Sequence, residues 1–115
     1  MAVVTADDAR RIALGLPGAE EKLSYENQAS FRTKARMFAM LTRNPDGVLI
    51  WLESKDERDS LVAAEPAKFS TSRHYAGQAT MLINLDAVDV QELMELITES
   101  WLLRAPPSLT RDWSN

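Results

Sequence analysis

A four-residue turn signal, from Asn44 to Gly47, separates two apolar runs near the middle of the chain. Pro45 presets the backbone angle φ at the second position of a β-turn, and Asp46 and Gly47 are favoured at the two positions that follow. The runs on either side are apolar and include aromatic residues, as strands often do. The sequence therefore predicts an antiparallel hairpin over residues 38–51.

The residues before this hairpin also have strand character. From residue 21 onward, apolar and polar residues are interleaved and no helical period is sustained. A shorter turn near Lys34 and Ala35 separates segment 30–33 from segment 36–42. We therefore expect a meander of antiparallel strands rather than one isolated hairpin.

Helices are expected on both sides of the meander. Thr5 and Asp8 form a capping-box pattern, and the apolar stripe that follows ends at Leu16, before Pro17 and Gly18. A second helix is expected to begin after Ser54, which has the character of an N-cap, and to end before a proline.

The last third of the chain is expected to hold a loop, a strand and the longest helix. Residues 69–78 are rich in Ser, Thr and Gly and predict a loop, and residues 80–85 predict a strand. Asp86 or Asp89 is expected to cap the final helix, which ends at the pair of prolines 106–107. This order of elements predicts a two-layer α+β domain, in which an antiparallel or mixed sheet has helices packed on one face.

Length and composition place the chain among ordinary single-domain proteins. It has 115 residues and a net charge of −4, and we expect one domain over residues 1–107 followed by a tail over residues 108–115. The absence of cysteine excludes disulfides and thiolate metal sites. The chain shows no signal-peptide pattern and no long apolar run, so a cytoplasmic protein that does not enter membranes is expected.

The cations are distributed unevenly along the sequence. Residues 30–43 and 66–84 together contain six Lys and Arg residues and no Asp or Glu. One interpretation is an anion-binding face. The other is that Lys and Arg at hairpins and strand edges block edge-to-edge pairing of sheets.

Few residues in the sequence suggest catalysis. His74 is the only histidine, and with Arg73 and Tyr75 it either contacts a small ligand or phosphate or is simply a packed or surface residue. One histidine and no cysteine provide no nucleophile–base pair and no metal-ligand set, and no phosphate-loop motif occurs. We therefore predict no catalytic residues, no metal site and no cofactor, although carboxylate catalysis and a weak cation site at the acidic start of the chain stay open.

Several separate blocks of this sequence resemble the MmcQ/YjbR family of small bacterial proteins. The blocks occur in the family's order and cover nearly the whole chain: Leu-Pro-Gly-Ala-Glu-Glu (16–21), Ser-Tyr (24–25), Ala-Ser-Phe-Arg-Thr (29–33), Lys-Ala-Arg-Met-Phe-Ala (34–39), His-Tyr (74–75), Glu-Ser-Trp (99–101) and Ala-Pro (105–106).

The resemblance implies a CyaY-like α+β fold, related in shape to frataxin, and a role in DNA binding through a double-wing arrangement of hairpins. Carried over by position, the candidate DNA-binding residues of the two wings are Arg32, Lys34 and Arg36 in the first hairpin and Arg73 and His74 in the later loop. The four Lys and Arg residues among them are expected to contact mainly DNA phosphates. The frataxin-like shape also raises iron binding, which ranks third because few acids lie near the first helix.

The alternative hypothesis is a non-enzymatic module that binds a small molecule or another protein. Its expected pocket lies on the sheet near Tyr25, Trp51, His74 and Tyr75. An enzyme is the hypothesis with the least support, because no catalytic constellation can be assembled from the sequence.

Overall fold

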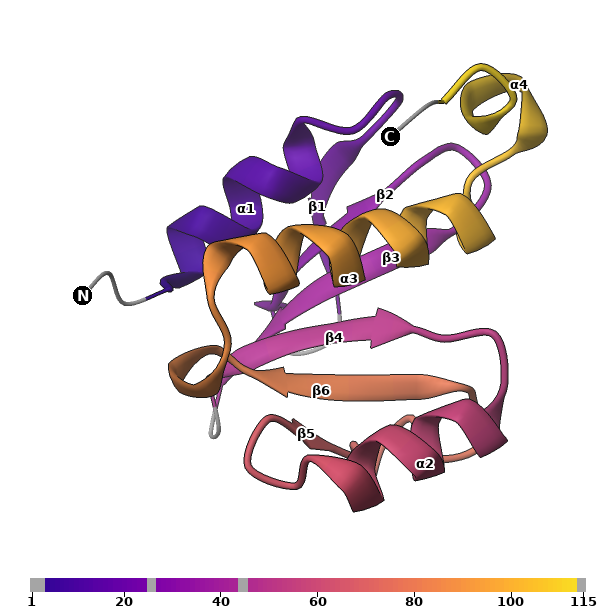
Figure 1. The fold of residues 1–115 in the computed structure, drawn as a ribbon. Coiled ribbons are helices and arrows are strands. Elements are labelled where there is room, and N and C mark those ends of the chain that lie inside the picture. Colours follow the sequence, from indigo (N-terminus) through magenta and orange to yellow (C-terminus); the bar gives the residue numbers. More distant parts are fainter. Residues whose placement is uncertain (1–3, 25–26, 44–45, 114–115) are drawn as a thin grey trace.

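A computed structural model describes residues 4–24, 27–43 and 46–113. In these ranges the chain forms a six-stranded sheet in the order β1-β2-β3-β4-β6-β5, and every neighbouring pair is antiparallel (Figure 1). The strands are β1 (Glu20–Leu23), β2 (Ala29–Arg32), β3 (Met37–Thr42), β4 (Gly47–Trp51), β5 (Phe69–Ser70) and β6 (Thr80–Asn84).

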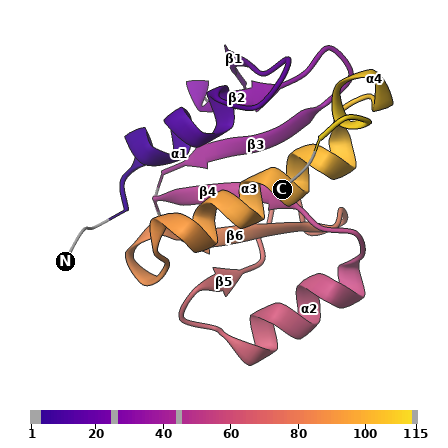
Figure 2. The ribbon, with the colours of Figure 1, turned by 45° about the horizontal axis from the view of Figure 1, so that its top comes forward.

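Helices α1 (Ala6–Leu14) and α3 (Val90–Arg104) cover one face of this sheet. The structure also contains α2 (Lys55–Ala64), α4 (Pro107–Thr110) and a 3₁₀ turn η2 (Leu85–Ala87) before α3. Helices α1 and α3 lie across the sheet, whereas α2 lies beside β5 and β6 at one edge (Figure 2). The predicted α+β class with an antiparallel sheet is confirmed.

The helices begin where the capping patterns predict. The side chain of Thr5 accepts a hydrogen bond from the backbone N–H of Asp8, and the Asp8 carboxylate accepts one from the N–H of Thr5. Ser54 caps α2 through the N–H of Glu57. Of the two candidate caps for the last helix, Asp89 is the residue that caps α3.

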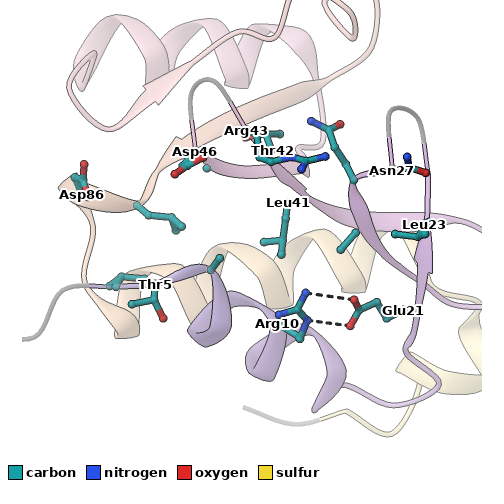
Figure 3. A pocket seen from close by; sticks show the side chains of 16 residues that line it. Thr5, Arg10, Glu21, Leu23, Asn27, Leu41, Thr42, Arg43, Asp46 and Asp86 are labelled. Atoms are coloured by element: carbon teal, nitrogen blue, oxygen red, sulfur yellow. Dashed lines mark hydrogen bonds and ion pairs between the residues drawn. The ribbon is translucent and has the colours of Figure 1, made fainter.

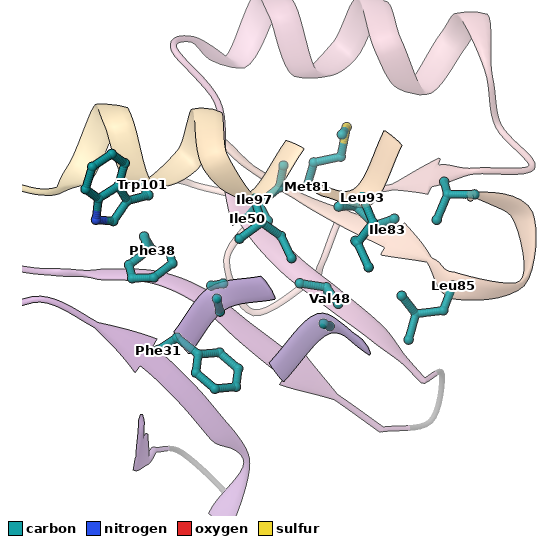
Figure 4. Close-up of a cluster of buried hydrophobic side chains, with 14 of the residues drawn as sticks. Phe31, Phe38, Val48, Ile50, Met81, Ile83, Leu85, Leu93, Ile97 and Trp101 are labelled. Atoms are coloured by element: carbon teal, nitrogen blue, oxygen red, sulfur yellow. The ribbon is translucent and has the colours of Figure 1, made fainter. Parts of the chain in front are cut away.

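The hydrophobic core lies between the sheet and helices α1 and α3 (Figure 4). Buried side chains of strands β2 to β6 point into it, and α3 contributes Leu93, Ile97 and Trp101, each with no exposed surface. Full burial of such a side chain contributes about 1.5–3 kcal/mol. The strand side chains in the core are Phe31, Phe38, Ala39, Val48, Ile50, Phe69, Met81 and Ile83.

The sheet differs from the sequence prediction at its last strand. The prediction that residues 69–78 form one loop was wrong at its start, because Phe69 and Ser70 form β5 and Phe69 pairs with Ile83. A two-residue strand is too short to show alternation. Its pairing depends on burial of Phe69, which is 3% exposed.

The predicted hairpin forms between β3 and β4. Thr42 pairs with Gly47 and Ala39 with Ile50, as the antiparallel register requires. Gly47 is needed at the start of β4, because a Cβ atom there would lie 2.5 Å from the carbonyl oxygen of Ile83 on β6. Residues Asn44 and Pro45 of the predicted turn lie outside the described residues.

The segment after residue 107 contains a short helix and two core contacts. Leu109 of α4 packs against the hydrophobic core. Trp113 lies edge-on to Trp101, with 5.0 Å between the ring centroids. The indole N–H of Trp101 donates to the carbonyl of Pro17, which joins α3 to the turn after α1.

Candidate functional site

One end of the sheet brings together loops that are far apart in the sequence. Because neighbouring strands are antiparallel, β2 and β4 end there and β3 and β6 begin there (Figure 1). The turn between β2 and β3, the loop 71–79 before β6, and the end of α3 lie at this end (Figure 1). We call it the basic end and define it by the side chains of Arg32, Lys34, Arg36, Arg73, His74 and Arg104.

Arg104 connects α3 to the sheet at the basic end. Its Nε–H donates to the carbonyl oxygen of Met37 at 2.9 Å. Its guanidinium carbon lies 4.3 Å from the ring centroid of Trp51, a cation–π geometry. Partial burial of Arg104, and then the positive charge of nearby Arg36, lower the pKa of Arg104. Arginine nevertheless stays protonated in proteins, so both groups carry a positive charge at the basic end.

Aromatic side chains continue from Arg104 across the open face of the sheet. The rings of Trp51 and Tyr75 meet edge to face with 6.3 Å between centroids, and those of His74 and Tyr75 with 4.7 Å. The indole N–H of Trp51 donates to the side chain of Gln78 at 3.3 Å. The alternative pocket residues Trp51, His74 and Tyr75 therefore form one cluster, whereas Tyr25 lies outside the described residues.

This aromatic cluster lies over a second, smaller set of buried apolar residues. Met40, Leu49 and Trp51 are buried on the face of the sheet opposite α1 and α3. Tyr75 packs against them from the loop 71–79. That loop is therefore part of the covering of the open face.

Hydrogen bonds from side chains of α2 and β6 hold the loop 71–79 in place. Arg58, which is 7% exposed, donates from Nη1 to the carbonyl oxygens of Ala76 and Gln78 at 3.1 and 2.9 Å. The hydroxyl of Thr80 donates to the carbonyl of Tyr75 at 3.0 Å. These bonds position the loop that carries Arg73 and His74.

The predicted cations at the basic end have different surroundings. Arg32 is the last residue of β2 and lies opposite Glu20 of β1 in the strand register, so an acidic neighbour offsets part of its charge. Lys34 and Arg36 are exposed in the β2–β3 turn, and Arg73 is exposed in the loop 71–79. Arg36 directly precedes Met37, whose carbonyl oxygen accepts a hydrogen bond from Arg104, and Arg104 in turn lies over Trp51 of the aromatic cluster.

Arg104 is the residue of this site that sequence reasoning missed. A basic residue in the last turn of a helix is explained by its favourable interaction with the helix dipole. The sequence therefore gives no sign that Arg104 has another role. Among the residues that the structure describes, neither Arg36 nor Arg104 forms an ion pair with a carboxylate. Cations elsewhere do, as in the pairs Arg10–Glu21 and Lys68–Glu92.

A separate cavity of about 500 Å³ lies where the start of α1 meets β1 and the β3–β4 hairpin (Figure 3). Arg10 lines it and donates to Glu21 at 3.0 Å and to Asp7 at 3.0 Å, and the hydrogen bond with Glu21 is the main cause that raises the pKa of Arg10. Arg43 and Asp46 also line the cavity, so its charge is mixed. Sequence reasoning missed this cavity because its residues come from four separate segments.

The described ranges hold neither a candidate metal-binding cluster nor a membrane-spanning helix. There, no three His, Asp or Glu side chains lie together in a way that could hold a metal ion. No helix in the same ranges is long and apolar enough to cross a bilayer.

Comparison with known proteins identifies the family. Residues 14–103 match the YjbR family model. The uncharacterized proteins Rv2570 of Mycobacterium tuberculosis and Mb2600 of Mycobacterium bovis are each 30% identical over 122 aligned residues, covering 95% of this chain and 95% of theirs.

A solved structure extends this similarity to the fold. The crystal structure of Deinococcus radiodurans protein DR2400, with a family-model domain DUF419, superposes with a TM-score of 0.75 at 25% sequence identity. The match covers 88% of this chain and 78% of that one. Because the family model spans most of the chain and the relatives match over nearly their full length, the chain belongs to the YjbR family.

Proposed function

We propose that this protein binds DNA through phosphate contacts at the basic end. The observation that carries the proposal is the hydrogen bond from Arg104 to the carbonyl of Met37, which places Arg104 near Arg36; neither arginine has a carboxylate partner among the described residues. Lys34 and Arg73 extend from the flanking turn and loop, where they are exposed. Phosphate contacts of this kind supply most of the affinity of a protein for DNA and do not depend on base sequence.

The net charge of −4 makes this interaction local. Acidic residues elsewhere repel DNA, so only an approach that presents the basic end is favourable. Four or five neutralised phosphates predict that log K falls with log salt at a slope of about −4. We expect weak binding at physiological salt and measurable binding at low salt.

Fluorescence anisotropy of a labelled duplex across a salt series tests the proposal. Arg36→Ala and Arg73→Ala should each weaken binding and reduce the magnitude of the slope by about 1. Arg11→Ala is the matched control, because it removes the same charge from the exposed side of α1. There, Nη2 of Arg11 lies 3.7 Å from Oδ1 of Asp8. No binding at low salt, or equal losses in all three variants, would contradict the proposal.

A second candidate function is the binding of a small polar molecule. The observation in its favour is the 500 Å³ cavity beside α1, which falls in the size range of ligand pockets and has both charged and apolar lining residues. Chemical-shift mapping with a metabolite panel tests it. Shifts at Thr5, Leu41 and Asp86 without shifts at the basic end would favour this function over DNA binding.

A further inference from the structure

Most hydrogen-bond donors of the Arg104 guanidinium have no partner among the residues that the structure describes. Arginine carries five N–H groups in a planar fork. The Nε–H of Arg104 is taken by the carbonyl of Met37. Among the described residues, no protein acceptor takes the N–H groups on its two Nη atoms. Within the described ranges, four donors in one plane therefore lack a protein acceptor, at a half-buried position.

The surroundings of Arg104 hold this fork in one orientation. The hydrogen bond to the carbonyl oxygen of Met37 fixes one edge of the guanidinium. The central carbon of the guanidinium lies 4.3 Å from the centroid of the Trp51 ring. Trp51 is in turn only 5% exposed and is anchored by its N–H to Gln78. A guanidinium held in this way loses little conformational entropy when it binds an anion.

Arg36 directly precedes Met37, whose carbonyl oxygen holds the fork, so it adds a second positive charge near Arg104. Two like charges at a partly desolvated position repel each other unless an anion lies between them. A phosphodiester within a strand carries one negative charge, whereas a terminal phosphate monoester carries about 1.5–2 at neutral pH and has three acceptor oxygens. The monoester therefore matches the two guanidinium groups better in charge and in hydrogen-bonding capacity.

We propose that Arg36 and Arg104 bind the terminal phosphate monoester of a nucleic-acid strand. The exposed His74 ring and the partly exposed Tyr75 ring, next to Trp51, provide a surface for the terminal base. This inference rests on the proposed function and adds that strand ends bearing a phosphate are preferred to internal sites.

The test compares one short duplex with 5′-phosphate ends and the same duplex with 5′-hydroxyl ends by anisotropy at low salt. We expect the natural protein to bind the phosphorylated duplex about tenfold more tightly. Arg36→Ala should reduce this ratio to nearly one. Arg104→Lys should also reduce it, because lysine keeps the charge but lacks the planar fork. Arg11→Ala should keep the ratio while removing the same charge as Arg36→Ala.

The outcomes separate this inference from the proposed function. Equal affinity of the natural protein for both duplexes would overturn the inference and leave DNA binding intact. The same conclusion would follow if Arg36→Ala and Arg104→Lys kept the preference for the phosphorylated duplex. Failure to bind either duplex would overturn both. Because Arg104 contacts Met37 and Trp51, its variant is checked by thermal unfolding, and the exposed Arg36 variant provides the test independently of folding.

Discussion

The hydroxyl of Ser100 joins α3 to Trp51 by accepting its backbone N–H at 2.9 Å, and it donates to the carbonyl oxygen of Phe38. The β3–β4 ladder ends at the pair formed by Ala39 and Ile50, so Phe38 and Trp51 occupy the position of the next pair. Phe38 also lies at the irregularity where β2 and β3 change register. Ser100 thus satisfies backbone groups that the sheet itself leaves unpaired.

Ser100→Ala is expected to lower the free energy of unfolding by about 1–3 kcal/mol, because it leaves a buried N–H and a buried carbonyl without partners. Urea unfolding measures this change. Ser60→Ala on the exposed side of α2 is the control and should change stability by less than about 0.5 kcal/mol. Equal stability of the two variants would show that Ser100 does not carry this role.

Two buried threonines are expected to respond in opposite directions to the same substitution. The hydroxyl of Thr33, which is 1% exposed, has no hydrogen-bond partner among the described residues. Thr33→Val removes an unsatisfied polar group without changing volume and should raise the unfolding free energy by about 1 kcal/mol.

Thr80→Val is the matched variant, because Thr80 is equally buried but donates to the carbonyl of Tyr75. It should lower the unfolding free energy by about 1 kcal/mol. Chemical denaturation of both variants measures the difference. A loss of stability in Thr33→Val would mean that its hydroxyl is satisfied in solution.

Arg58→Met is expected to loosen the loop 71–79. The substitution keeps an apolar stem but removes the bonds to the carbonyls of Ala76 and Gln78, each a charge-assisted bond of about 1.5–3 kcal/mol. Hydrogen exchange should become faster in the loop before it does in the core. Asp59→Asn is the control. Asp59 pairs with Arg58 but is 65% exposed, so its loss should have little effect.

Stability is expected to fall in acid through Asp8. Hydrogen bonding to the backbone N–H of Thr5 is the main cause that lowers the pKa of Asp8 below the ordinary value of 3.8. Because the folded pKa is depressed, this contribution is present above pH 3.8 and is lost as the pH falls through the folded pKa. An NMR titration of Asp8 measures the folded value, and Asp8→Asn should reduce the acid sensitivity of α1. An unshifted titration would contradict the capping assignment.

Much of the secondary structure follows from local patterns. The caps at Thr5 and Ser54 depend on neighbours within one helical turn, so the sequence shows them directly. The β3–β4 pairing follows from turn chemistry on either side of Gly47. By contrast, β5 has two residues and all four residues of β1 are exposed, so neither shows the alternation that predicts a strand.

The candidate site divides in the same way. The sequence by itself determined that Lys34, Arg36 and Arg73 lie in acid-free turns and loops, because charge distribution and turn residues can be read locally. Only the tertiary structure decided that Arg104 lies over Trp51 and bonds to the carbonyl of Met37, next to Arg36. That contact depends on strand register, on the irregularity beside Phe38 and on how α3 docks across the sheet, and these are set by packing between distant segments.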